Sequence, residues 1–254
     1  MTALRSIAMA FACFSSIPMP QVPWTKSNMQ YLMAAFPLVG VAVGGACLLW
    51  FAICGKLGVG PIVRGVGITL LPLAVSGGIH MDGFADVVDA QASHAEPAEK
   101  RRILKDPHVG AFAVMGICAY MLLYFACACE LDERLAILVA CIPVTSRSLA
   151  GLAALCWPVS GKSGMLASIR ESTRMGVTRA ALALQLALAV VAMLCGSPVV
   201  GGVAIVVAGL VFAWAWRFSI KQFGGLSGDL VGFCLQVLEL AMLVCVVLAE
   251  RFVQ

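Results

Sequence analysis

Residues 180–216 read AALALQLALAVVAMLCGSPVVGGVAIVVAGLVFAWAW and contain no Asp, Glu, Lys or Arg. A helix that crosses a bilayer needs about 20 apolar residues, so this stretch is long enough for two crossings. The Gly-Ser-Pro sequence at 196–198 is a turn signal near its middle. We therefore predict two membrane-spanning helices, 180–195 and 199–216, joined by a short turn.

The rest of the chain has the same apolar character. Of its 254 residues, 61% are hydrophobic and 12% are charged, and the mean hydropathy is +0.99. Apolar runs bounded by turn residues predict five further spans, at 31–54, 62–79, 110–128, 135–157 and 230–250. The apolar stretch 6–17 is too short to span and precedes three prolines, which favours a partial or re-entrant helix. We predict an all-α fold, a polytopic transmembrane helical bundle with about seven spans, as a single domain over 1–254.

Basic residues are distributed unequally over the two sides that these spans define. One side receives eleven: Lys26, Lys100, Arg101, Arg102, Lys105, Lys162, Arg170, Arg174, Arg179, Arg217 and Lys221. The other side receives four: Lys56, Arg64, Arg134 and Arg251. Basic residues collect on the cytoplasmic side of membrane proteins, so we expect the first side to be cytoplasmic. No block of like charge suggests nucleic-acid binding.

The polar segment 77–110 lies on this predicted cytoplasmic side. Asp82, Asp86 and Asp89 stand at i, i+4 and i+7, so they share one face of a helix. Three carboxylates so placed repel one another unless a cation lies between them. Oxygen ligands suit Mg²⁺, which proteins typically hold with one or two carboxylates plus substrate phosphates. The spacing therefore predicts a magnesium site.

A solvated loop is the alternative interpretation of this segment, because most charge runs simply face water. Two features favour a site. Asp82 directly follows an apolar span, at a depth where charge is costly, and Gly83 leaves room for a ligand near the backbone. The basic residues of 100–105 could hold phosphate. Zinc is disfavoured, because the histidines lack the spacing of a zinc pair.

A second polar element, FGGLSGDL at 223–230, precedes the last predicted span. Its glycines and Ser227 at a helix start offer N–H groups to an anion, and Asp229 offers one more carboxylate to a cation. The alternative is a turn with Asp229 as the helix cap. We expect this element and residues 80–110 to form one site.

Two charged residues lie inside apolar runs, Arg147 and Glu239. Charges within a membrane face a partner or a cavity. The sequence leaves open whether these two pair with each other or line the site.

The stretch 77–89 resembles the pattern Gly-Gly-x-His-x-Asp-Gly-x-Ala-Asp-x-x-Asp of the cobalamin synthase family, the adenosylcobinamide-GDP ribazoletransferases. Residues 105–110 match its Lys-Asp-x-x-x-Gly element, and 224–232 with Glu239 match its closing element. The similarity covers nearly the whole chain. Departures occur at 15–16, where Ser-Ser replaces Thr-Arg, and at Arg102 and Ala113, where the family usually has Glu and Gly.

The resemblance implies a transferase of the bacterial inner membrane with a cytoplasmic active face. A hydroxyl of α-ribazole, or of its 5′-phosphate, would attack the cobinamide-side phosphorus of adenosylcobinamide-GDP, and GMP would leave. The expected partners are these substrates and the lipid bilayer. Whether the chain also forms a homo-oligomer is left open by the sequence. Asp89 is the expected proton acceptor. The expected catalytic residues are Asp82, Asp86 and Asp89, and the expected Mg²⁺ ligands are the same three with Asp229. The expected substrate-binding residues are His80, Arg101, Lys105, Asp106, His108, Gly110, Arg147, Gly225 and Ser227.

Two other classes of protein fit the composition. A CDP-alcohol phosphotransferase also places aspartates and Mg²⁺ at a membrane face, but it normally has an Arg where this chain has Asp86. A transporter would favour inverted halves and broken helices near mid-membrane, whereas the acidic cluster here lies at the edge.

Overall fold

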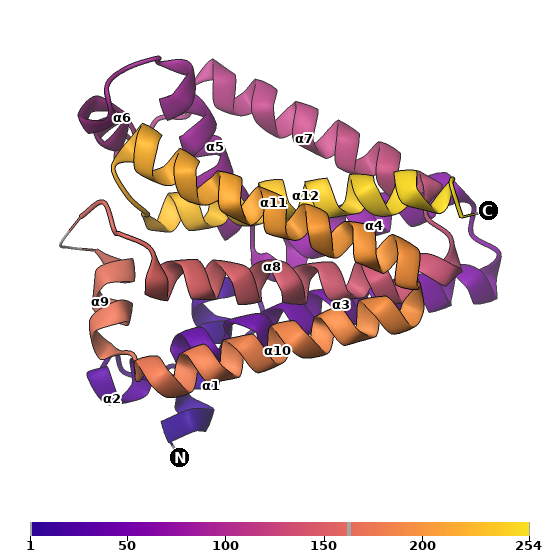
Figure 1. The fold of residues 1–254 in the computed structure, drawn as a ribbon, viewed down its shortest axis with the longest axis horizontal. Helices are drawn as coiled ribbons and strands as arrows, with labels where there is room; N and C mark the ends of the chain where they lie inside the picture. Colours follow the sequence, from indigo (N-terminus) through magenta and orange to yellow (C-terminus); the bar gives the residue numbers. More distant parts are fainter. Residues whose placement is uncertain (1, 162–163, 254) are drawn as a thin grey trace.

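The computed structural model describes residues 2–161 and 164–253, which form a bundle of α-helices (Figure 1). In this described part, six helices are long and apolar enough to cross a membrane. They are α3 (Leu32–Leu57), α7 (Ala111–Glu130), α8 (Ala136–Cys156), α10 (Met175–Gly196), α11 (Pro198–Phe223) and α12 (Gly228–Glu250). They confirm the predicted all-α, multi-pass membrane bundle. Of the eleven basic residues counted above, Lys162 lies outside the described residues.

The predicted turn at 196–198 separates α10 from α11. The Ser197 hydroxyl oxygen accepts a hydrogen bond from the Val200 N–H at 3.3 Å and so caps α11. Pro198 occupies the first turn, where its missing N–H costs nothing.

The predicted span 62–79 is wrong at its carboxyl end. Helix α4 (Pro61–Ser76) ends at Ser76, and the next helix, α5 (Ile79–Ala92), is bent by 94° relative to α4. Gly77 and Gly78 between them have φ angles of 65° and 77°, a left-handed conformation that residues with a Cβ adopt only with strain. The described residues therefore form six unbroken crossings, and up to seven if the bent α4–α5 pair counts as one crossing.

The N-terminal helix α1 (Thr2–Phe14) is short, as expected. Its 13 residues extend about 20 Å, less than the hydrocarbon core of a bilayer. The residues that follow α1 hold the end of α4. The Ser16 hydroxyl donates to the Ala74 carbonyl oxygen at 2.5 Å, and the Ser16 N–H donates to the Val75 oxygen at 2.9 Å. The chain after α1 is thereby fixed beside the bend.

Four short helices complete the described elements: α2 (Lys26–Met29), α6 (Pro97–Ile103), the 3₁₀ turn η1 (Glu133–Leu135) and α9 (Met165–Ser172). Figure 1 shows α2, α6 and α9 together at one end of the bundle. This is the end that the basic residues predict to be cytoplasmic.

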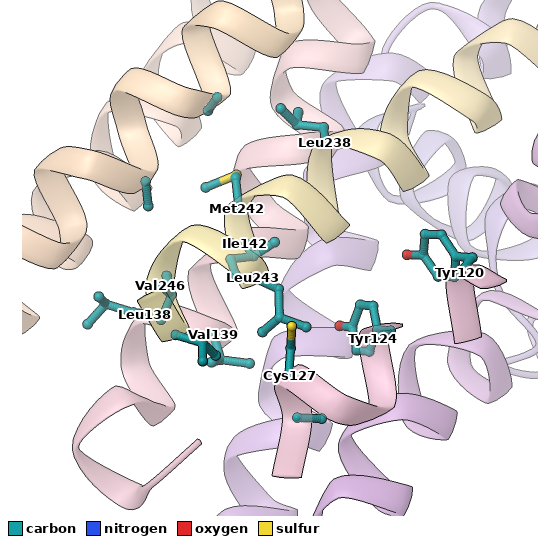
Figure 2. Packing of buried hydrophobic residues seen from close by; sticks show 14 of the residues in the cluster. Tyr120, Tyr124, Cys127, Leu138, Val139, Ile142, Leu238, Met242, Leu243 and Val246 are labelled. Carbon is teal, nitrogen blue, oxygen red and sulfur yellow. The ribbon is translucent and has the colours of Figure 1, made fainter. Parts of the chain in front are cut away.

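The bundle interior is close-packed around α8 and α12. A Cβ on Gly44 of α3 would lie 2.2 Å from the Ala140 oxygen of α8, so these two backbones touch, as small residues allow in membrane bundles. Figure 2 shows apolar side chains of α7, α8 and α12 meeting in the interior. They include Tyr120, Tyr124, Cys127, Leu138, Val139, Ile142, Leu238, Met242, Leu243 and Val246.

Candidate active site

A cavity of about 470 Å³ lies at the end of the bundle that carries α6 and α9. Segments far apart in the sequence build its wall, from α1 to the start of α12. Its polar and charged lining residues are His80, Asp82, Arg101, Lys105, Ser160, Ser227 and Asp229. Residues of both polar elements of the sequence thus line one cavity, as a composite site requires.

A close crossing of α5 and α12 brings the two elements together. A Cβ on Gly83 would lie 2.8 Å from the carbonyl oxygen of Asp229, and a Cβ on Gly232 would lie 3.0 Å from that of His80. The neighbouring Asp82 therefore lies beside the start of α12. The expectation that Gly83 leaves room for a ligand is wrong, because the α12 backbone fills that room.

The carboxylates of this region influence one another. Asp86 lies one turn beyond Asp82 on α5, outside the six spanning helices and outside the cavity wall. Burial raises the pKa of Asp86 to about 6, with further upward contributions from Asp82, Asp229 and Asp89. Within the described residues, no three His, Cys, Asp or Glu side chains are grouped closely enough to form a ready-made metal cage. The acidic groups are close enough to repel but are not preassembled.

Asp89 has a structural partner that the sequence did not reveal. Its Oδ1 accepts a hydrogen bond from the Ala113 N–H at 2.9 Å, and its Oδ2 accepts one from the Gly110 N–H. These are orphan donors at the start of α7, so Asp89 caps α7 and ties it to α5. Neither Asp89 nor Gly110 lines the cavity, and the Gly110 N–H predicted to bind substrate is already used.

Arg101 and Lys105 line the cavity, as predicted. The Arg101 Nη1 donates to the Phe223 carbonyl oxygen at 2.7 Å, which holds the guanidinium against the end of α11. Its neighbour on α6, Lys100, is an unpredicted anchor with 4% of its surface exposed. The Lys100 ammonium donates to the side-chain oxygens of Gln91 at 2.9 Å and Gln222 at 2.6 Å. Lys100 thus joins α6 to α5 and α11.

Asp106 and His108 lie in an exposed turn outside the cavity wall. The Asp106 Oδ1 accepts a hydrogen bond from the His108 backbone N–H at 3.0 Å and lies 2.5 Å from His108 Nδ1. These hydrogen bonds lower the pKa of Asp106. The structure therefore does not bring this predicted pair to the cavity.

Arg147 does not line the cavity but is buried in the bundle interior. Its Nη1 donates to Glu239 Oε1 at 2.7 Å, and the Ser146 hydroxyl donates to the same oxygen at 2.7 Å. Of the two alternatives left open by the sequence, the pairing of Arg147 with Glu239 is confirmed. The structure does not bring Arg147, expected to bind substrate, into the cavity wall: its guanidinium pairs with Glu239 behind the wall, with Cζ 6.0 Å from the centre of the Phe36 ring.

Ser227 and Asp229 both line the cavity at the start of α12. The Ser227 hydroxyl oxygen accepts from the Leu230 N–H at 3.3 Å, so Ser227 is the helix cap. Asp229 therefore is not the cap, and its carboxylate lies in the first helical turn, where the orphan N–H groups also lie.

Gly225, in contrast, supports the wall from behind and does not line it. Its N–H donates to the Ser219 carbonyl oxygen at 3.1 Å, so it is not available to a substrate as predicted. The next residue, Leu226, donates to the Pro158 oxygen at 2.8 Å and accepts from the Ser160 N–H at 3.0 Å. These bonds fix the segment after α8 beside the start of α12. Ser160 is a lining residue that no sequence signal singled out.

His80 lines the cavity, as predicted, but is almost fully buried, with 4% of its surface exposed. Burial and the nearby Arg147 guanidinium lower the pKa of its imidazole. Neither ring nitrogen has a hydrogen-bond partner. The sequence also missed the apolar part of the wall around it, because its residues look like ordinary core positions. These apolar residues are Phe14, Met33, Phe36, Ala154, Leu166, Ile169 and Val231.

The fold and this cavity define a multi-pass helical membrane protein that gathers carboxylates, basic side chains and a helix N-terminus at one end. That set of groups is typical of proteins that bind and transfer phosphoryl groups. The chain belongs to the cobalamin-5-phosphate synthase family, whose family model matches residues 6–247.

Individual relatives are similar over most of their length. The chain is 36% identical to the adenosylcobinamide-GDP ribazoletransferase of Lachnoclostridium phytofermentans, over 97% of this chain and 95% of the relative. It is 32% identical to that of Geobacillus thermodenitrificans, over 88% of each chain, and 28% identical to that of Clostridium botulinum strain Alaska E43, over 93% and 94%. No solved structure matches. The family resemblance read from the motifs is confirmed, and the phosphotransferase and transporter alternatives are set aside.

Proposed function

We propose that the chain transfers the cobinamide phosphate of adenosylcobinamide-GDP to α-ribazole or α-ribazole 5′-phosphate. A hydroxyl oxygen of the acceptor forms a bond to the cobinamide-side phosphorus, and the bond from that phosphorus to the oxygen bridging to GMP breaks. GMP leaves, and the product is adenosylcobalamin or its 5′-phosphate. Family membership over nearly the whole chain is the observation that carries this proposal.

The cavity supports this reaction with groups suited to a pyrophosphate. Arg101 and Lys105 bind phosphate oxygens from one side of the wall, and Ser227 with the first N–H groups of α12 binds them from another. Asp82 and Asp229 are the carboxylates within reach of the acceptor hydroxyl. One of these two accepts its proton, in place of Asp89, whose oxygens accept backbone hydrogen bonds.

The same acidic groups fit Mg²⁺. Asp82 and Asp229 present oxygen ligands to the cavity, and Asp86 lies one turn away under the repulsion of both. A site without three grouped protein ligands suits this ion, which is usually held by one or two carboxylates plus substrate phosphates and water. A bound Mg²⁺ supplies charge neutralisation to the pyrophosphate oxygens.

The cavity end of the bundle is proposed to face the cytoplasm of a bacterial cell, across the inner membrane. The basic residues of α6, α9 and their flanking segments support this orientation by the positive-inside rule. Nucleotide substrates are also most accessible from that side.

The test measures GMP release from adenosylcobinamide-GDP labelled in its guanosine, with purified protein in detergent and α-ribazole as acceptor. We expect Asp82→Ala to reduce release by about a hundredfold or more, because a group acting on the transition-state charge is lost. EDTA should abolish release by the wild type. Asp132→Ala, at the far end of the bundle, is the matched control and should retain activity.

Each outcome addresses one part of the proposal. Absence of GMP release from the wild type with either acceptor would refute the transfer reaction. Native rates from Asp82→Ala in the presence of EDTA would leave the reaction standing and refute the metal and carboxylate roles.

A further inference from the structure

The cavity has an apolar wall that the transfer reaction, as described so far, does not use. Phe14 of α1 and Phe36 of α3 face it together with side chains of α8, α9 and α12. These residues all belong to the second hydrophobic cluster of the core, so the apolar wall is continuous with well-packed interior. Such a surface binds flat apolar groups, not phosphates.

His80 is the polar exception in this wall. Its ring lies 5.7 Å from that of Phe36 and 6.3 Å from that of Phe14, at an angle of 20° to the latter. Both of its ring nitrogens are buried and lack a hydrogen-bond partner, and 4% of the residue's surface is exposed. Buried polar atoms are nearly always hydrogen-bonded, so an unpartnered imidazole in a cavity wall points to a ligand that completes it.

We propose that this apolar wall and His80 bind the aromatic base of the acceptor nucleoside. The inference rests on the proposed transfer to α-ribazole. The base of α-ribazole is a dimethylbenzimidazole, which is planar, apolar and carries one unsubstituted ring nitrogen that accepts a hydrogen bond. An imidazole offers one N–H donor for it, and the half-buried Phe14 ring, which packs against the buried Phe36 ring, offers a stacking surface.

Guanine, the other base among the substrates, suits this wall less well. Its edge carries several donors and acceptors, whereas His80 is the one polar side chain among the apolar wall residues. The remaining polar groups of guanine would be buried without partners, which is strongly unfavourable.

The position of His80 also suits the chemistry. His80 and Asp82 both line the cavity from the first turn of α5, and Asp229 adjoins this turn through Gly83. A base held against His80 therefore places its ribose next to the two wall carboxylates. The acceptor hydroxyls then lie where a proton acceptor is available.

The test is equilibrium binding of radiolabelled α-ribazole to the purified full-length protein, without turnover. Phe14→Leu removes the stacking ring, and His80→Phe keeps a ring but removes the donor. We expect each to weaken α-ribazole binding about tenfold and to leave GDP binding unchanged. Phe11→Leu is the matched control, because Phe11 is a half-buried phenylalanine of the same helix that does not line the cavity.

A second probe isolates the proposed hydrogen bond. The dimethylindole ribonucleoside has the same shape as α-ribazole but lacks the accepting ring nitrogen. It should bind the wild type about tenfold more weakly than α-ribazole does. The His80→Phe variant, which lacks the donor, should bind the two nucleosides with equal affinity. Each variant is used in the binding assay only if it elutes as a single folded species in size-exclusion chromatography.

Three outcomes would overturn the base site: no α-ribazole binding to the wild type with or without GDP, unchanged binding in both variants, or a loss of GDP binding instead. The last result would assign the wall to guanine. A wild type that binds α-ribazole as described but releases no GMP would refute the transfer reaction and leave the base site standing.

Discussion

The buried pair of Arg147 and Glu239 allows a quantitative prediction. The two side chains are 1% and 3% exposed, and their charged atoms lie 2.7 Å apart. Substituting Glu239 by Leu leaves the guanidinium buried without its counter-charge and removes one of the two acceptors of the Ser146 hydroxyl, the other being the Pro143 carbonyl oxygen. Breaking a buried pair in this way costs about 3–5 kcal/mol of folding free energy. For a chain of this size that corresponds to a fall in melting temperature on the order of 10 °C.

The double variant Arg147→Met/Glu239→Leu distinguishes the loss of the whole ion pair from the loss of one of its charges. Replacing both charges by apolar groups is often neutral, so the double variant should recover most of the loss. An exposed pair gives the control. Arg251 and Glu130 lie 2.6 Å apart with 63% and 54% of their side chains exposed, and Glu130→Gln should cost less than about 1 kcal/mol.

Thermal unfolding in detergent measures all three variants, and GMP release measures their function. Because neither Arg147 nor Glu239 lines the cavity, the double variant should retain transfer activity. A Glu239→Leu protein as stable as the wild type would refute the energetic reasoning. A stable double variant without activity would refute the separation of this pair from the site and return Arg147 to substrate binding.

Three further perturbations test the geometry around the cavity. Asp89→Ala should lower stability by about 1–2 kcal/mol in thermal unfolding, because two N–H groups at the start of α7 lose their acceptor, and an unchanged melting temperature would contradict the capping role. Gly83→Ala places a Cβ 2.8 Å from a backbone oxygen of α12 and should reduce GMP release at least about tenfold, whereas Gly45→Ala, with nothing within 4 Å, should not. In a background without native cysteines, Ser93→Cys should react with an impermeant thiol reagent only from the cytoplasmic side and Asp132→Cys only from the opposite side; the reverse pattern would invert the proposed orientation.

The sequence predicted the spans well, because lipid imposes a simple rule on length and hydropathy. A run such as 180–216 admits few other structures, since its backbone must satisfy its own hydrogen bonds. The exception was the span 62–79. The bend there depends on the φ angles of Gly77 and Gly78, which a pair of adjacent glycines permits but does not require.

The site was predicted in part, and the errors share a cause. Asp82, Asp229 and Arg101 were expected together, because charged residues at a membrane edge must meet a ligand, a counter-charge or water. Asp89 stands on the same helix face as Asp82, yet its partners are backbone N–H groups 21 and 24 residues away. Helical spacing predicts which residues share a face, but not which donor from another helix faces them. The apolar wall around Phe36 was missed for a related reason: core and cavity positions have the same composition.

Two sets of charged side chains in this bundle differ in how they are neutralised. Arg147 and Glu239 neutralise each other in an interior that is already close-packed, so no ligand is needed there. Asp82, Asp86 and Asp229 have the same sign, and Asp82 and Asp229 add to the raised pKa of Asp86, while two of the three open on a cavity. Like charges gathered in this way are destabilising by themselves, and the cavity-lining Arg101 already donates a hydrogen bond to the Phe223 carbonyl oxygen. We therefore propose the external cation at the acidic cluster and not at the intramembrane pair, so the magnesium proposal rests on these aspartates and the stability prediction rests on Arg147 and Glu239.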